Sequence, residues 1–220
     1  MRVVLRLKKG SPIRLVDEQQ TQYTARVEQV TNREVLARII ESHTPEVRQS
    51  ARLSVIQGIP RLPKADWITQ KLTELGIQSI VFAPTEYTPY RDGFDRMCRR
   101  LSRLRTIAET AAKQCARRDI PSVSVHADLK KAAETAAPGT IFLVADEKAP
   151  RRRLCDLFSQ TPDDAPLAVF IGPEGGLSEK EKEYLQDLGA SGFSLGQNIL
   201  RTETAAITAS AIILYELGVI

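Results

Sequence analysis

Hydrophobic and polar residues alternate with a period of two over much of the first sixty residues. In "YTARVEQV" the side chains of Tyr23, Ala25 and Val27 fall on one side, and the alternation resumes in "EVLARII" after the turn "TNR". A period of two is typical of a half-buried β-strand. The pattern therefore predicts a small β-rich module over residues 1–58.

The period changes after "IPRLPKA", where two prolines interrupt regular structure. "DWITQKLTELG" places Ile68, Leu72 and Leu75 on one helical face and ends at Gly76, a residue suited to a helix C-terminus. The apolar runs "QSIVFAP", "IPSVSV", "TIFLVAD" and "PLAVFIG" follow, separated by helical segments. This alternation predicts an α/β domain with a mostly parallel sheet covered on both faces. We predict two domains, residues 1–60 and residues 61–220.

A long helix is predicted from about Asp92 to Arg118. One face is apolar and is expected to be buried: Met97, Leu101, Leu104, Ala108, Ala111 and Cys115. The opposite face is basic and consists of Arg96, Arg99, Arg100, Arg103, Lys113, Arg117 and Arg118. Such a stripe is either a solvated surface or a track for RNA phosphates. The excess of arginine favours phosphate, which the guanidinium group binds through two hydrogen bonds.

Composition bears on whether the protein is membrane-bound, secreted or metal-binding. The chain has 220 residues, 26% of them charged, and a net charge of +4, which is compatible with a polyanionic partner. No apolar run is long enough for a membrane span, and the N-terminus does not resemble a signal peptide. Cys98, Cys115 and Cys155 show no metal-binding or disulfide spacing, and His43 and His126 are isolated. We therefore expect a cytoplasmic protein without a metal site or membrane association.

The segment "FIGPEGGLSEKE" places three glycines directly after an apolar run. Glycine allows a backbone to approach a ligand closely, and loops at the carboxyl ends of parallel strands are where α/β sheets bind ligands. Ser178 and Glu181 have the spacing of a capping box, which predicts that a helix starts after this loop. The loop matches neither phosphate-binding glycine motif. It is either a ligand-binding loop or a tight structural turn.

A second segment, "GFSLGQNILRTETAAITASAIILYELG", predicts a short strand at Phe193–Leu195 and a long apolar helix with Thr202 at its N-cap. Together with "FIGPEGGLSEKE", it resembles the signature of the SPOUT class of RNA methyltransferases, and more narrowly of the RsmE family. "VVLRLKKGSPIRLVD", "KLTELGIQSIVFAPTEY" and "IAETAAKQCARRDIPSV" extend the resemblance over essentially the whole chain.

This resemblance implies a fold and an activity. The expected architecture is α/β, with a small N-terminal PUA-like β-barrel that binds RNA and a SPOUT α/β domain with a C-terminal deep trefoil knot. The implied activity is methylation of uridine N3 in small-subunit (16S) ribosomal RNA. The implied cofactor is S-adenosyl-L-methionine, and the implied assembly is a homodimer.

The resemblance also implies site residues. The cofactor is expected to contact Val144, Gly172, Pro173, Glu174, Gly175, Gly176, Leu195, Gly196, Ile199, Leu200, Thr204 and Ala205. Phosphates are expected to contact Arg96, Arg99, Arg100, Arg103 and Arg117. Arg201 is the expected catalytic residue, contacting RNA or a uracil oxygen.

Three of these assignments have alternatives. Arg201 could instead form a salt bridge with Glu203 or Glu174. Glu174 could contact the cofactor, or it could be held by backbone amides at the helix start near Ser178. Glu203, at the first helical turn, could be structural or a general base.

Two departures from the family pattern stand out. Family members carry a longer segment before "VLRLKKG", so either the start codon is misassigned or the barrel lacks an edge strand and is shortened on its N-terminal side. Tyr87 in "TEYTPY" occupies the position of an arginine in the family motif, so an RNA or interface contact from that arginine is not expected here. Two other functions remain open: a SPOUT enzyme that methylates a ribose 2′-hydroxyl, and a non-catalytic RNA-binding protein.

Overall fold

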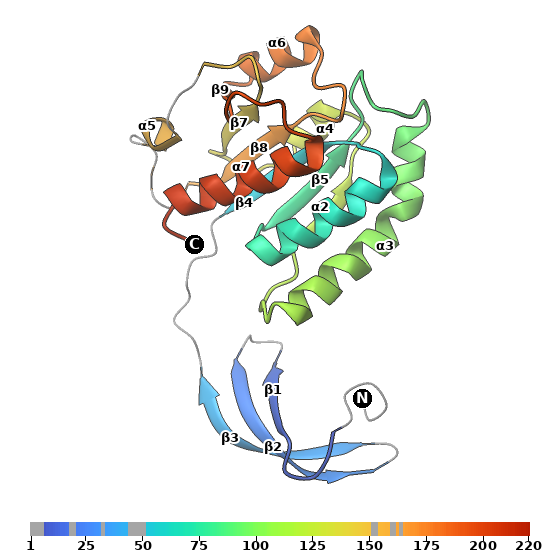
Figure 1. The fold of residues 1–220 in the computed structure, drawn as a ribbon, viewed down its shortest axis with the longest axis vertical. Coiled ribbons are helices and arrows are strands. Elements are labelled where there is room, and N and C mark those ends of the chain that lie inside the picture. Colours follow the sequence, from blue (N-terminus) through green and yellow to red (C-terminus); the bar gives the residue numbers. More distant parts are fainter. Residues whose placement is uncertain are drawn as a thin grey trace. The chain divides into compact units, whose positions relative to one another are not determined.

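The computed structural model describes residues 7–17, 21–31, 34–43, 52–150, 154–158, 162 and 165–220 (Figure 1). The chain forms two compact units, Met1–Arg48 and Gln49–Ile220. Each unit has its own sheet.

The N-terminal unit contains an antiparallel sheet of three strands. β1 (Pro12–Val16), β2 (Gln22–Val30) and β3 (Val35–His43) pair in that order. Ala25 and Val27 of β2 are buried, as the alternating pattern predicted. The predicted β-rich character of this region is therefore confirmed.

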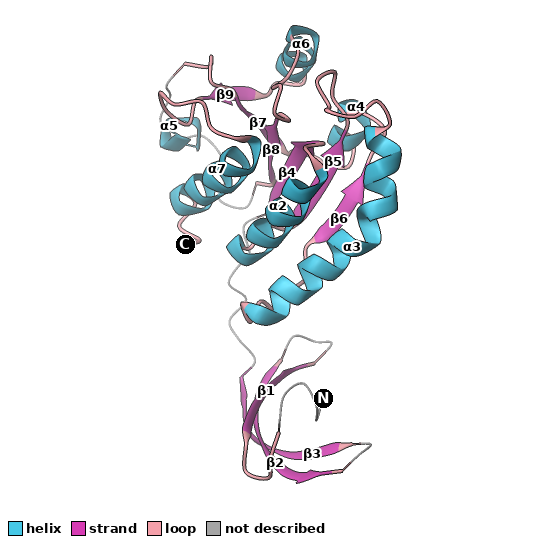
Figure 2. Cartoon of the chain, turned by 45° about the vertical axis from the view of Figure 1, so that its right-hand side comes forward, coloured by secondary structure: helices cyan, strands magenta, loops and turns pink. Residues whose placement is uncertain are grey.

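The second unit is built on a parallel sheet of six strands. The strands are β4 (Leu53–Gly58), β5 (Ser79–Ala83), β6 (Ser122–Val125), β7 (Ile141–Ala145), β8 (Leu167–Ile171) and β9 (Ser191–Phe193). Their spatial order is β6-β5-β4-β8-β7-β9, and every pair of neighbours is parallel (Figure 2). All strands therefore present their carboxyl ends, and the loops that follow them, at one edge of the sheet.

The domain boundary differs from the prediction. We placed it after residue 60, but β4 pairs with β5 on one side and β8 on the other, so it is a central strand of the second unit. The boundary lies at Arg48–Gln49. The prolines after β4 mark the turn into the first helix and not a linker between domains.

Helices cover both faces of this sheet. One face carries α2 (Leu62–Leu75), α3 (Gly93–Gln114), α5 (Leu154–Phe158) and α7 (Thr202–Glu216), and the other carries α4 (Leu129–Ala133) and α6 (Glu179–Asp187). The alternation along β8 shows the division, because Val169 and Ile171 join the core under α2 and α7, whereas Ala168 and Phe170 join the core under α4 and α6. The predicted α/β arrangement is confirmed.

The long basic helix is shorter than predicted. α3 buries Met97, Leu104, Ala108 and Ala111 on the expected face. Cys115, predicted to lie on that face, is exposed because the helix ends at Gln114 and Cys115 is its C-cap residue. The next residue, Ala116, has a φ of 55° and turns the chain away.

The start of α7 also differs from the prediction. Arg201, and not Thr202, is the N-cap residue, and Thr202 is the first helical residue. Its hydroxyl donates a hydrogen bond to the Gly172 carbonyl oxygen at 2.6 Å instead of capping the helix. The helix packs against α2, β4 and β8. No helix in the described part of the chain is long and apolar enough to cross a membrane.

Candidate active site

A pocket of about 440 Å³ lies at the carboxyl edge of the parallel sheet. Three segments form most of its wall: residues 145–148 after β7, residues 172–179 after β8, and residues 199–202 before α7. Lys64, Tyr87, Ile171, Lys182 and Ala205 complete it. This volume lies in the range of small-molecule sites, which is about 300–1,000 Å³.

The glycine loop after β8 requires residues without side chains. A Cβ atom on Gly172 would lie 2.9 Å from the Gly176 carbonyl carbon, which is too close for two unbonded carbons. Gly176 has a φ of 75°, and its N–H donates to the Pro173 carbonyl oxygen at 2.9 Å. The loop therefore folds back on itself and presents bare backbone to the pocket.

Gln57, at the end of β4, fixes this loop from below and was missed by the sequence analysis. The side chain is fully buried. Its Nε2 donates to the Gly58 carbonyl at 2.9 Å, to the Gly172 carbonyl at 3.2 Å, and to Thr202 Oγ1 at 2.9 Å. It thus joins three segments under the pocket. The sequence feature that could have indicated its role is a polar residue near the end of the apolar run "LSVIQG". A polar side chain buried there needs hydrogen-bond partners.

The predicted capping box is confirmed. Ser178 Oγ accepts from the Glu181 N–H, and Glu181 Oε2 accepts from the Ser178 N–H at 2.8 Å. The other oxygen, Glu181 Oε1, accepts from the Glu86 N–H at 2.9 Å. This one carboxylate therefore starts α6 and also holds the loop after β5 beside it.

Lys64, in the first turn of α2, is a second residue that the sequence analysis missed. Its Nζ lies 3.0 Å from Glu174 Oε1 and 2.9 Å from Glu203 Oε2. Glu174 also accepts from the Arg61 N–H at 3.2 Å, so it is held at the start of α2 and not of α6. Burial acts to raise the pKa of Glu203, but the Lys64 ammonium outweighs this effect, and the pKa lies below its usual value. A lowered pKa makes the Glu203 carboxylate a weaker base, and its Oε2 is already paired with Lys64, which favours the structural interpretation over a general base.

Arg201 is exposed and lines the pocket. Its two predicted alternative partners, Glu174 and Glu203, are paired with Lys64. Arg201 forms no hydrogen bond and no ion pair within 4 Å in the described ranges, although its charge helps to lower the pKa of Glu203. The guanidinium group is therefore available to a substrate.

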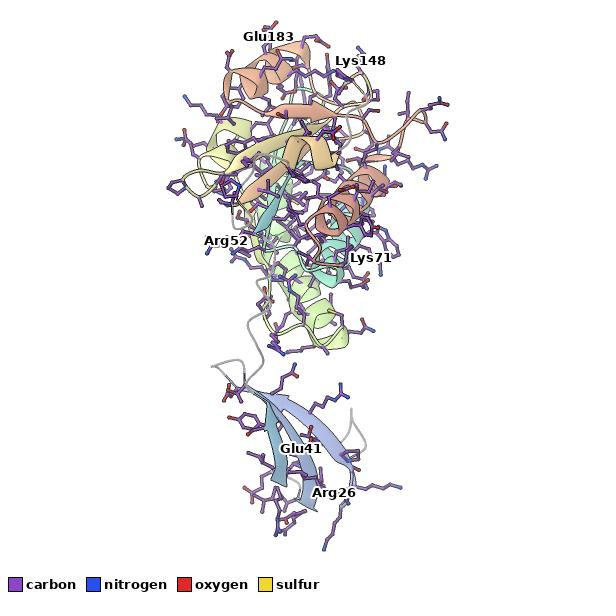
Figure 3. The ribbon with its side chains drawn as sticks, turned by 90° about the vertical axis from the view of Figure 1, so that its left-hand side faces the viewer. Arg26, Glu41, Arg52, Lys71, Lys148 and Glu183 are labelled. Atoms are coloured by element: carbon purple, nitrogen blue, oxygen red, sulfur yellow. The ribbon has the colours of Figure 1, made fainter. Side chains whose placement is uncertain are left out.

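A further ion pair closes the pocket on the β7 side. Lys182 Nζ of α6 lies 2.9 Å from Asp146 Oδ2. Burial acts to raise the pKa of Asp146, but hydrogen bonds from Lys182 and from the Lys148 N–H outweigh this effect and lower the pKa. Figure 3 shows Lys148 at the same end of this unit as Glu183 of α6. The pair joins the segment after β7 to the helix that follows the glycine loop.

Most of the predicted cofactor residues come together in this pocket. The predicted residues that line it are Gly172, Pro173, Glu174, Gly175, Gly176, Ile199, Leu200 and Ala205. Val144, Leu195, Gly196 and Thr204 are outside it. Val144 is buried in the core under α4 and α6, whereas Gly196 lies in an exposed loop and has a φ of 129°.

The basic stripe on α3 is largely occupied by ion pairs. Arg100 and Arg103 both contact Asp66 of α2, at 2.6 Å and 3.0 Å. Arg96 lies 2.6 Å from Asp92, and Arg99 lies 3.6 Å from the same aspartate.

Arg117 is only 8% exposed and donates to Asp119 and to the Thr73 carbonyl oxygen. Of the predicted phosphate contacts, Arg99 is therefore the most accessible and Arg117 the least. No group of histidine, cysteine, aspartate or glutamate side chains in the described ranges is arranged to hold a metal ion.

Comparison with known proteins identifies the family. A family model for the RNA methyltransferase domain matches residues 47–214. The ribosomal RNA small subunit methyltransferase E of Mycobacterium bovis is 30% identical over 189 residues, which cover 83% of this chain and 70% of the relative. The chain belongs to this family. The prediction from the two C-terminal motifs is confirmed.

Other methyltransferase E proteins match over nearly the full chain. The Bacillus subtilis protein is 26% identical over 217 residues, which cover 97% of this chain and 85% of the relative. The solved structure of the Neisseria gonorrhoeae protein, bound to S-adenosyl methionine, superposes with a TM-score of 0.80 at 25% identity. It covers 97% of this chain and 86% of the Neisseria chain.

Proposed function

We propose that this protein transfers a methyl group from S-adenosylmethionine to N3 of a uridine in small-subunit (16S) ribosomal RNA. The observation that carries the proposal is the glycine loop Gly172–Gly176, whose bare backbone faces the pocket with Arg201. The names of the methyltransferase E relatives state that they methylate small-subunit ribosomal RNA. The solved structure of the Neisseria relative is bound to S-adenosyl methionine. Their similarity to this chain supports the same activity.

The residues of the pocket suit this cofactor. A Cβ atom on Gly172 would fill the turn against which the ligand is expected to lie, and apolar side chains of Ile199, Leu200 and Ala205 stand on the other wall. Backbone N–H and C=O groups in such a wall distinguish the polar edges of an adenosine, and the apolar side chains pack on its faces. When bound, the cofactor supplies an electrophilic methyl group on a sulfonium.

The chain itself has two tasks in the reaction. The first is to hold the uracil ring with N3 toward the methyl group, because orientation removes much of the entropic part of the barrier. The second is to stabilise the negative charge that develops on the uracil oxygens as N3 loses its proton to water. Arg201 fits the second task because its guanidinium group is unpaired among the described residues and lies at the pocket. Lys64 is already paired with two carboxylates and fits a positioning role.

The proposal includes a trefoil knot and a homodimer. The chain leaves β9 at the edge of the sheet and returns to its middle, where α7 packs on β4 and β8. This path suits the threading of a knot. α7 also exposes Ile212 and Tyr215 while it buries Ala206, Ala209 and Ile213. A helix that is apolar on more than one side suits a subunit interface.

The N-terminal unit is proposed to bind RNA as a PUA-like barrel. It presents a compact antiparallel sheet with basic residues such as Arg26 and Arg38. These residues would contact phosphates at the N-terminal unit, and Arg99 of α3 would do so at the second unit.

The test is methylation of deproteinised small-subunit ribosomal RNA from cells that lack the protein. The purified protein and labelled S-adenosylmethionine are added, and the digested nucleosides are analysed by mass spectrometry. We expect 3-methyluridine at one position. A ribose-methylated nucleoside would assign the other SPOUT chemistry, and cofactor binding without transfer would assign an RNA-binding role. Sedimentation at micromolar concentration tests the dimer.

A further inference from the structure

Tyr87 stands at the wall of the pocket with much of its ring uncovered. It lies in the loop between β5 and α3, is 48% exposed, and lines the same pocket as Gly175 and Arg201. Its hydroxyl makes no hydrogen bond within the described ranges. A large aromatic ring that is left open to a pocket is available to pack against a ligand.

The position of Tyr87 is fixed by hydrogen bonds on both sides. The Glu86 N–H donates to Glu181 Oε1 of α6 at 2.9 Å. The Thr88 N–H donates to the Thr85 carbonyl oxygen at 3.1 Å, and Thr88 Oγ1 accepts from the Thr85 N–H at 2.7 Å. The backbone on both sides of Tyr87 is therefore held in place. Less conformational entropy of this loop is lost when a ligand binds against the tyrosine.

Tyr87 also packs on the glycine loop. A Cβ atom on Gly175 would lie 2.6 Å from Tyr87 Cβ, so this contact is possible only because Gly175 has no side chain. The tyrosine therefore lies directly over the backbone that faces the pocket. Gly175 and Tyr87 both line the pocket, so a ligand held there has this tyrosine among its walls.

We propose that Tyr87 is a specificity-determining residue on which the target uracil stacks. This inference rests on the proposed function and deepens it. Proteins bind unpaired RNA bases by stacking them on aromatic side chains, and an enzyme that modifies a base must take it out of the helix stack. Arg201 in the same pocket supplies a hydrogen-bond donor for the polar edge of a base whose face lies on Tyr87.

The test compares Tyr87→Phe, Tyr87→Leu and Tyr87→Ala, with Ile120→Ala as a matched control. Ile120 is 55% exposed and does not line the pocket. Single-turnover methylation of small-subunit ribosomal RNA should fall roughly 10- to 100-fold in kcat/KM for the leucine and alanine variants, as expected for the loss of one stacked base. The phenylalanine and Ile120 variants should stay near wild type.

Two readouts separate stacking from a packing role. Leucine still fills the space over Gly175, so Tyr87→Leu should keep the melting temperature and the calorimetric affinity for S-adenosylmethionine. RNA with 5-iodouridine at the methylated position should photo-crosslink to Tyr87 in the wild type. A Tyr87→Leu enzyme with a normal rate would overturn the inference. So would a crosslink confined to other residues, or a loss of cofactor affinity as large as the loss of rate, which would assign the ring to the cofactor.

If the wild-type protein methylates no uridine, the proposed function fails, whatever the variants do. If the wild type is active and the Tyr87 variants match it, only the inference about Tyr87 fails.

Discussion

Lys64 Nζ lies 2.9 Å from Glu203 Oε2, so the first turns of α2 and α7 are joined by an ion pair beside the pocket at the carboxyl ends of the strands. The same ammonium group reaches Glu174 in the glycine loop. One lysine therefore holds two like-charged carboxylates together at the point where three segments of the chain meet.

Replacing this lysine should lower both the free energy of unfolding and the affinity for the cofactor. We expect Lys64→Met to lower the free energy of unfolding by about 2 kcal/mol, because two partly buried carboxylates would lose their shared cation. The cofactor affinity should fall with it. Urea unfolding and calorimetry measure the two effects. Lys71→Met is the control, since Lys71 pairs with Glu74 along the same helix and such pairs contribute about 0.5 kcal/mol or less. Equal losses in the two variants would contradict the bridging role.

Arg201→Ala should separate binding from chemistry. Because Arg201 is exposed and unpaired among the described residues, its loss should leave the melting temperature and the cofactor affinity unchanged. Methyl transfer should fall by roughly 100-fold or more, the size expected for one preorganised charged donor. Arg201→Lys should recover little, because an ammonium group cannot reproduce the planar guanidinium geometry. A normal single-turnover rate in the alanine variant would remove Arg201 from the reaction.

Arg99 and Arg117 form a matched pair for the RNA surface. Arg99→Ala should lower the slope of log affinity against log salt by about 0.7–0.9, with no change in melting temperature. Arg117→Ala should lower the melting temperature and leave the salt slope unchanged, because this guanidinium group is buried against Asp119 and the Thr73 carbonyl. Filter binding at several salt concentrations gives the slopes. An unchanged slope for Arg99→Ala would show that the exposed end of the stripe is a solvated face.

The Asp146–Lys182 pair should make the stability of the folded protein depend on pH. The pKa of Asp146 is lowered in the folded protein, so its contribution is present above the unfolded pKa, about 3.9, and is lost as the pH falls through the lower folded pKa. Asp146→Asn should therefore be less stable than wild type at pH 7, and the difference should shrink in acid. Melting temperatures from pH 7 to pH 3 measure this. Glu134→Gln, which removes an exposed partner of Lys131, is the control. A constant difference at all pH values would contradict the prediction.

The parts of the site that the sequence predicted were local in the chain. The glycine loop, the capping box of Ser178 and Glu181, and the strands β5 to β8 each follow from a period or from turn chemistry within a dozen residues. The family followed from two such segments. None of these features depends on which segments meet in space.

The parts that the sequence did not predict depend on contacts between distant segments. Gln57 and Thr202 are 145 residues apart, and nothing near either residue indicates the other. The same holds for Lys64 with Glu174 and Glu203. Local periodicity also could not assign β4 to its sheet. A strand has the same hydrophobic pattern in either unit, and only the pairing of β4 with β8 shows to which sheet it belongs.

The amide of Gln57 has a consequence for the order in which the protein becomes active. It binds groups from β4, from the glycine loop and from α7, so the floor of the pocket exists only when an early strand and a late helix have come together. Contacts of such long sequence separation form late and slowly in folding. During synthesis, a chain that has emerged only as far as the glycine loop would carry that loop without the helix that completes the floor. The floor of the pocket is therefore complete only after α7, near the end of the chain, has left the ribosome.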